Sequence, residues 1–91
     1  MRESGTWMTI WDDRILEYLS EHGGAAVGEL SSSESIRVSN THVSRRCRKL
    51  AEHDLVQAIG NGAYVITEQG EAYLNEEYDA EHGAFIDGLE S

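Results

Sequence analysis

The feature that most limits the fold is a hairpin signal in the second half of the chain. Residues 55–59 and 63–67 are two short apolar segments, and residues 60–62 between them read Gly-Asn-Gly. Asn-Gly readily adopts the left-handed backbone conformations of a tight turn, so this segment predicts two antiparallel strands joined by a short turn. The apolar patterns on both sides have helical spacing. We therefore expect a mainly α-helical, α+β domain with a small β-hairpin.

Four helices are predicted around this hairpin, at about residues 10–21, 27–35, 40–53 and 68–78. The first has an apolar stripe at helical spacing that is expected in the core, made of Trp11, Ile15, Tyr18 and Leu19. Residues 25–26 are a candidate short strand, whereas the serine run at 31–33 is typical of caps and turns. The order helix, strand, helix, helix, hairpin, helix is that of a winged helix-turn-helix domain, in which the third helix recognises DNA and the hairpin is the wing.

The length of 91 residues allows one hydrophobic core. We expect three parts: an N-terminal extension at 1–9, the winged helix-turn-helix domain at 10–78 and an acidic C-terminal tail at 79–91. Phe85, Ile86 and Leu89 keep helical spacing, so the tail is either frayed or a docking segment. No apolar run approaches the length of a membrane span, and no secretion signal is evident at the start. The single cysteine, Cys47, fits a reducing cytoplasm.

The charges are divided unequally along the chain, whose net charge is −10. Such acidity argues against nucleic acid, because an acidic surface repels phosphate. However, residues 37–50 hold five basic and no acidic residues, whereas residues 51–91 hold ten acidic and no basic ones. A basic block of this kind is typical of a DNA-binding surface. The alternative is an exposed helix face that pairs with neighbouring carboxylates.

The acidic background carries its own interpretation. The chain has 17 acidic residues, and a single lysine accompanies six arginines. A strongly acidic surface keeps a protein soluble and is common in proteins of halophiles. We therefore expect a protein adapted to concentrated salt, with an ordinary acidic domain as the alternative.

The basic block coincides with the predicted third helix. Val43, Cys47 and Leu50 fall on one face of that helix, and the cations fall on the opposite face. Residues 39–42 supply short polar side chains at the helix end that approaches base edges, although each can also serve simply as a cap or an exposed residue. The candidate DNA-contacting residues are Ser39, Asn40, Thr41, His42, Ser44, Arg45, Arg46, Arg48, Lys49 and Asn61.

Different roles are expected within this set. Arg45 is the best candidate to bind guanine, and Arg48 and Lys49, further along the helix, are expected to contact phosphates. Arg46 borders the apolar stripe, so it would reach the DNA backbone or pair with a carboxylate. Asn61 lies in a wing without cations, where it would contact the minor groove or serve only as a turn residue.

Catalysis and metal binding find little support in the sequence. The four histidines are dispersed, and Cys47 faces the core side of its helix, away from His42. No pair of ligands has a usual metal-binding spacing, and the glycines lack the pattern of a phosphate-binding loop. We therefore predict neither an enzyme nor a bound cofactor, metal or small molecule.

Several segments together resemble a known family. They are residues 11–19, 43–46, 49–50, 55–56, 62–64 and 66–74. In these segments the chain resembles the small winged-helix regulators of haloarchaea that are similar to the phage phi-H repressor. The resemblance implies a DNA-binding transcriptional regulator that forms a homodimer. The chain departs from the family pattern in its serine-rich second helix region and in a wing without arginine. The alternative function is a winged-helix protein-interaction module that uses the basic block to hold an acidic partner.

Overall fold

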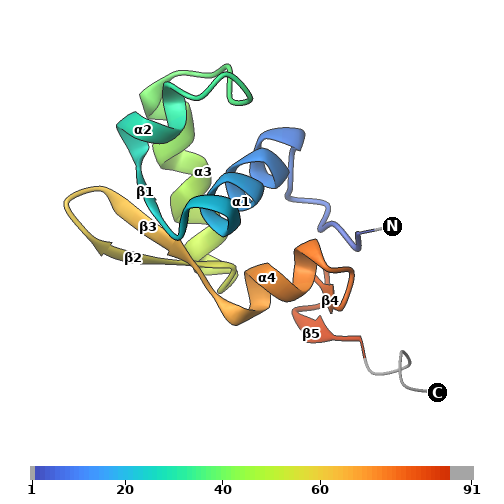
Figure 1. Ribbon diagram of the computed structural model, residues 1–91. Coiled ribbons are helices and arrows are strands. Elements are labelled where there is room, and N and C mark those ends of the chain that lie inside the picture. Colours follow the sequence, from blue (N-terminus) through green and yellow to red (C-terminus); the bar gives the residue numbers. More distant parts are fainter. Residues whose placement is uncertain (1, 87–91) are drawn as a thin grey trace.

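The structure, a computed structural model, describes residues 2–86 (Figure 1). Its elements are α1 (Ile10–His22), β1 (Ala25–Ala26), α2 (Val27–Ser31), α3 (Asn40–Glu52), β2 (Val56–Gly60), β3 (Ala63–Ile66), α4 (Glu68–Leu74), β4 (Tyr78–Asp79) and β5 (Ala84–Phe85). The predicted order of helices and strands is confirmed up to α4, and the arrangement is that of a winged helix-turn-helix domain.

The β2–β3 hairpin, called the wing below, belongs to a three-stranded antiparallel sheet. The strand order is β1-β3-β2, and Ala25 of β1 pairs with Tyr64 of β3. At the tip, Asn61 and Gly62 have φ values of 55° and 74°, the left-handed conformations that an Asn-Gly turn adopts. The hairpin and the short strand at residues 25–26 are therefore both confirmed.

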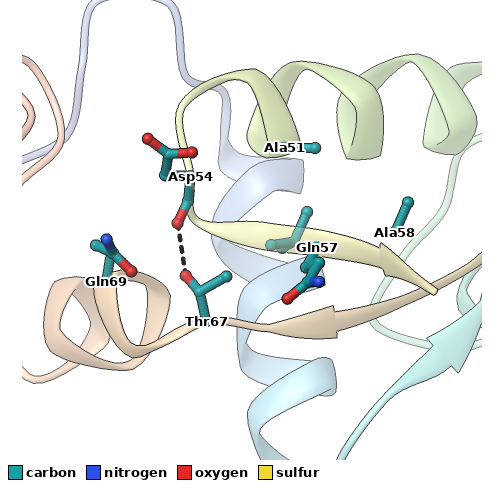
Figure 2. A pocket seen from close by; sticks show the side chains of 7 residues that line it. Ala51, Asp54, Gln57, Ala58, Thr67 and Gln69 are labelled. Atoms are coloured by element: carbon teal, nitrogen blue, oxygen red, sulfur yellow. Dashed lines mark hydrogen bonds between the residues drawn. The ribbon is translucent and has the colours of Figure 1, made fainter.

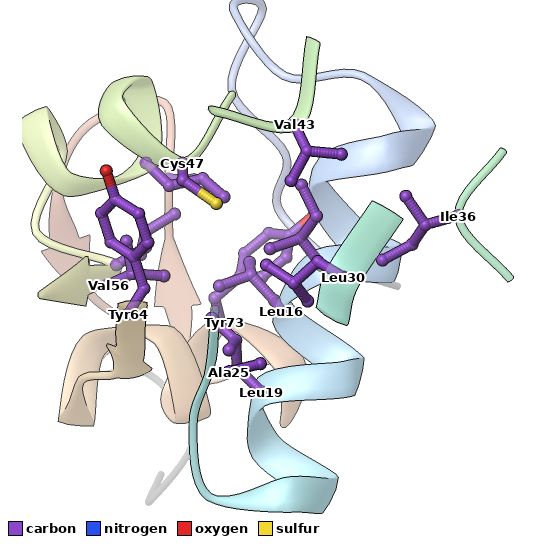
Figure 3. Packing of buried hydrophobic residues seen from close by; sticks show 14 of the residues in the cluster. Leu16, Leu19, Ala25, Leu30, Ile36, Val43, Cys47, Val56, Tyr64 and Tyr73 are labelled. Atoms are coloured by element: carbon purple, nitrogen blue, oxygen red, sulfur yellow. The ribbon is translucent and has the colours of Figure 1, made fainter. Parts of the chain in front are cut away.

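The core lies between the three N-terminal helices, the sheet and α4 (Figure 3). On α3 it contains Val43, Cys47 and Leu50, as the helical spacing predicts. On α1 the prediction is wrong in one position. Trp11 is only half-buried, whereas Leu16 is fully buried beside Ile15 and Leu19. The buried face of α1 is thus turned toward Leu16.

Two helices are shorter than the sequence predicts. α2 ends at Ser31 rather than near Ser35, because the Ser32 hydroxyl donates to the Gly28 carbonyl at 2.9 Å and the Ser31 hydroxyl lies 3.2 Å from the same carbonyl. Serine side chains compete in this way with backbone hydrogen bonding and favour helix ends. α4 ends at Leu74 rather than Tyr78, and the chain then turns through Glu76, which has a φ of 65°.

The two terminal segments contact each other and the core. Residues 2–9, expected as an extension, are held by Arg2, which donates to Glu17 at 2.8 Å, and by a 2.8 Å hydrogen bond between the hydroxyls of Ser4 and Tyr73. Part of the expected tail forms the β4–β5 hairpin, and Ala80 of this segment is buried in the core. The predicted helical spacing there includes Leu89, which lies outside the described residues.

Cys47 gives a first test of the core. Its side chain is fully buried, and this burial raises the pKa of the thiol to about 12. Because the thiolate is the reactive form, we expect Ellman's reagent at pH 8 to react with the folded protein only very slowly. The same protein in urea should react at once and with one equivalent. Rapid stoichiometric reaction of the folded protein would contradict this packing of α3.

Candidate nucleic-acid interface

The outer face of α3 carries the polar residues that the sequence singled out. Thr41, Arg45 and Arg48 are exposed, and the remaining members of that face, His42, Ser44 and Lys49, are half-buried. Figure 1 shows α3 between α2 and the wing. The separation of an apolar inner face from a basic outer face is therefore confirmed.

Ion pairs divide the seven basic residues into two groups. Arg2 and Arg14 pair with Glu17, Lys49 lies 3.9 Å from Glu52, and Arg46 pairs with a carboxylate of α1. In the part of the chain that the structure describes, the other three form no ion pair with a carboxylate; they are Arg37, Arg45 and Arg48. All three belong to the basic block. Arg45 and Arg48 thus present positive charge on α3 that neighbouring carboxylates do not neutralise.

Arg46 points toward α1 instead of outward. Its Nε donates to Asp12 Oδ1 at 2.9 Å, and its Nη2 donates to Asp12 Oδ2 at 2.7 Å and to the Trp7 carbonyl at 2.9 Å. The Asp12 side chain is 0% exposed. The hydrogen bond to Asp12 raises the pKa of Arg46, so the guanidinium is charged. Of the two roles that the sequence left open for Arg46, pairing with a carboxylate is the one seen here.

The first turn of α3 contains both capping and free polar groups. The Ser39 hydroxyl accepts a hydrogen bond from the His42 amide at 3.2 Å, so Ser39 is the N-cap. The Ser31 hydroxyl donates to the Asn40 side-chain oxygen, which leaves the amide nitrogen of Asn40 available. Thr41 is fully on the outer face. Ser39 therefore acts as a helix cap, the alternative to a DNA contact that the sequence allowed. The polar side chains of residues 40–42 are at least partly exposed to solvent.

The wing adds exposed surface without positive charge. Asn61 lies at its tip and is exposed, and Ile59 of β2 has 60% of its surface accessible. Figure 2 shows an open hollow of about 310 Å³ at the base of the wing, where the Thr67 hydroxyl donates to the Asp54 carbonyl at 2.6 Å. Asp54 contributes a carboxylate there, and no basic residue lines the hollow. The hollow therefore does not extend the basic face of α3.

Residues 1–83 match the family model described as winged helix-turn-helix phage repressor. The chain belongs to this family. Its structure is also similar to the crystal structure of the PhiH1 repressor-like protein from Haloarcula marismortui, with 59% sequence identity and a TM-score of 0.92. The match covers 94% of this chain and 98% of that chain. No curated protein matches the chain.

Membership of the phage repressor family confirms the resemblance drawn from the sequence. It supports a role as a DNA-binding regulator in general and points to a regulator rather than an enzyme. Within residues 2–86, no group of three or more His, Cys, Asp or Glu side chains is arranged to hold a metal ion. No helix in the same part of the chain has the length and apolar character needed to cross a membrane.

Sequence reasoning missed two residues beside the basic face of this family member. Asp12 lies three residues after the N-cap Thr9, and its carboxylate accepts a hydrogen bond from the Thr9 amide at 2.8 Å, a local role that does not reveal its contact with Arg46. No pattern in the sequence points to Trp7, although its carbonyl accepts a hydrogen bond from Arg46 and its ring stacks on His53 at 3.8 Å. The one available signal was an acidic residue on the face of α1 that also carries Ile15 and Leu19.

Proposed function

We propose that this protein is a sequence-specific transcriptional regulator that places α3 in the major groove of double-stranded DNA. The observation that carries the proposal is the pair of exposed arginines on α3, Arg45 and Arg48, which no carboxylate within residues 2–86 neutralises. A helix of this width fits the major groove, and its first turns approach the base edges. Thr41 and His42 supply polar groups at that end.

The charge distribution supports an orientation on DNA. The chain outside the basic block is strongly acidic, so electrostatic repulsion turns that remainder away from the phosphates. We also infer a halophilic archaeal origin from the acidic, lysine-poor composition, and the Haloarcula marismortui relative supports it. Concentrated salt weakens phosphate contacts, so in such a cell base contacts carry a larger share of the discrimination.

The proposal also includes the oligomeric state of the protein and its location in the cell. The family resemblance supports a homodimer, whose two α3 helices would read half-sites about one helical turn of DNA apart. The single cysteine, which is buried and unpaired, fits the reducing cytoplasm as the place of action. Sedimentation with and without a duplex would determine whether one or two copies bind.

Two substitutions on α3 separate base reading from phosphate binding. Arg45→Ala is expected to cost about 1–3 kcal/mol of binding free energy on the preferred duplex, because a guanine contact is lost, and less on random duplexes, where only the general attraction of its charge to phosphates is lost. Lys49→Ala is expected to weaken binding on all duplexes alike and to flatten the salt dependence, because a phosphate contact is lost. Fluorescence anisotropy at several KCl concentrations measures both effects. Equal losses on all duplexes for both variants would contradict these roles.

Mobility shift in concentrated KCl against DNA from upstream of the protein's own coding region tests the function itself. A shifted complex that survives an excess of random competitor is the expected result. Absence of a shift on every fragment, together with a stable protein partner in a pull-down, would instead favour the protein-interaction module.

A further inference from the structure

A small hollow lies where the start of α1 meets the outer face of α3. It has a volume of about 160 Å³ and is lined by Thr9, His42, Arg45 and Arg46. We call it the Thr9 hollow. All four lining residues carry hydrogen-bond donors on their side chains, and no carboxylate residue lines it. In this it differs from the hollow at the base of the wing.

Arg46 is fixed in the wall of the Thr9 hollow. Two of its nitrogens, Nε and Nη2, donate to Asp12 and to the Trp7 carbonyl, and its side chain is only 19% exposed. Its third nitrogen, Nη1, has no hydrogen-bond partner among residues 2–86. A long side chain normally loses rotamer freedom when it binds a ligand. Here the fold has already restricted that freedom, so Nη1 is a positioned donor.

The charges around the hollow favour an anion. Asp12 compensates the charge of Arg46, so the uncompensated positive charge comes from Arg45, which has no carboxylate partner in the described part of the chain. The Thr9 hydroxyl and the His42 ring add donors that carry no compensating anion. Several donors that line one hollow beside one uncompensated positive charge suit a group with several acceptor oxygens, such as phosphate.

We propose that the Thr9 hollow holds one phosphate of the DNA backbone and that Thr9 is a DNA contact outside α3. The inference rests on the proposed function, because α3 must lie in the groove for a backbone phosphate to reach its flank. His42 and Arg45 belong both to the hollow and to the outer face of α3, so this phosphate borders the base pairs that α3 contacts. The hollow thus sets how deeply and at what angle α3 enters the groove.

Methylphosphonate interference tests the proposal. Each phosphate of a tightly bound duplex is replaced in turn by a neutral methylphosphonate, and affinity is measured for the wild type and for Thr9→Val. Besides the phosphates that Arg48 and Lys49 contact, the wild type should lose about tenfold at one further phosphate, the one held in the Thr9 hollow. Thr9→Val should bind the unmodified duplex several-fold more weakly and lose most of its sensitivity at that same phosphate. Undiminished sensitivity of Thr9→Val at every phosphate would overturn the proposal.

Thr9 is also the N-cap of α1, so loss of sensitivity at a single phosphate, together with matched variants, separates the contact from effects on folding. Thr9→Ser keeps the hydroxyl and should behave as the wild type. Thr6→Val makes the same change at an exposed threonine away from the hollow and should leave the interference pattern unchanged. His42→Ala removes a different donor and should reduce sensitivity at the same phosphate as Thr9→Val. If Thr9→Val and His42→Ala lose sensitivity at two different phosphates, the two residues do not share one phosphate site and the proposal is overturned.

Two further outcomes are distinguishable. Inorganic phosphate added without DNA, at constant ionic strength, should not saturate the amide signals of Thr9 and His42 in NMR spectra. Two results together would overturn the assignment to DNA: saturation of these amide signals at millimolar phosphate, and an unchanged interference pattern in Thr9→Val. They would show that the hollow binds free phosphate instead. Failure of the wild type to bind any duplex would overturn the proposed function as well. If the wild type binds DNA but Thr9→Val keeps the same phosphate sensitivity, only the phosphate site in the Thr9 hollow is overturned.

Discussion

Replacement of Arg46 by alanine is expected to lower the free energy of unfolding by about 3–5 kcal/mol. The substitution leaves the Asp12 carboxylate, which is 0% exposed, without the guanidinium that donates two hydrogen bonds to it. It also removes the donor to the Trp7 carbonyl. A buried charge that loses its partner keeps its full desolvation cost, and this cost is much larger than the net stabilisation of an intact pair. Urea unfolding in concentrated KCl measures the loss.

Two controls identify the buried pair as the cause. Lys49→Ala removes the half-buried partner of the exposed Glu52 from the same helix and should cost at most about 1 kcal/mol. The double variant Asp12→Ala with Arg46→Ala should lose less than the sum of the two single losses, because no unpaired charge remains. An Arg46→Ala protein within about 1 kcal/mol of the wild type would contradict the inward orientation of Arg46.

The two kinds of arginine on α3 respond differently to salt. Exposed charges are screened over a few ångströms in concentrated salt, whereas a buried pair is screened much less. Under the proposed function, the attraction of Arg45 and Arg48 to DNA therefore weakens as salt rises, while the Asp12–Arg46 pair continues to hold α3 on α1. In such a solvent α3 keeps its position on α1 even where the proposed attraction to DNA weakens.

Most of the fold could be predicted from local patterns. The Asn61-Gly62 turn and the 43–47–50 stripe of α3 depend on neighbours in sequence, and both are confirmed. The length of α2 depends on serine hydroxyls that compete with backbone amides for the Gly28 carbonyl. The spacing of apolar residues does not predict such competition. The β4–β5 hairpin consists of two-residue strands, too short to produce an alternating pattern.

The sequence was sufficient to predict which charged residues lie on the outer face of α3, but not which residues pair with them. Helical phasing alone separated Arg45 and Arg48 from the core. It placed Arg46 at the border, where the outcome depends on whether a carboxylate lies across the helix interface. That carboxylate, Asp12, is 34 residues away in sequence, and only the packing of α1 on α3 brings the two together. The contribution of Thr9 to the hollow has the same origin.

Gly70 carries a second large effect that no sequence pattern reveals. Gly70→Ala is expected to destabilise the protein by about 3 kcal/mol, at the upper end for overpacked sites. A Cβ atom at this position in α4 would collide with the Leu55 backbone carbonyl and with the Ile66 side chain. A carbonyl held in the backbone cannot move aside as a flexible side chain can, so α4 would have to shift away from the sheet.

The glycine in α2 provides the matched control for this prediction. A Cβ atom at Gly28 would meet nothing within 4 Å, so Gly28→Ala should stabilise the protein by about 0.5–1 kcal/mol through its higher helix propensity. The same chemical change in two helices is therefore expected to have opposite signs. Thermal and urea unfolding of both variants measure them together. Because propensity favours alanine at both sites, any loss at Gly70 reports steric contact alone, and a Gly70→Ala protein as stable as the wild type would show that α4 does not pack this closely on Leu55.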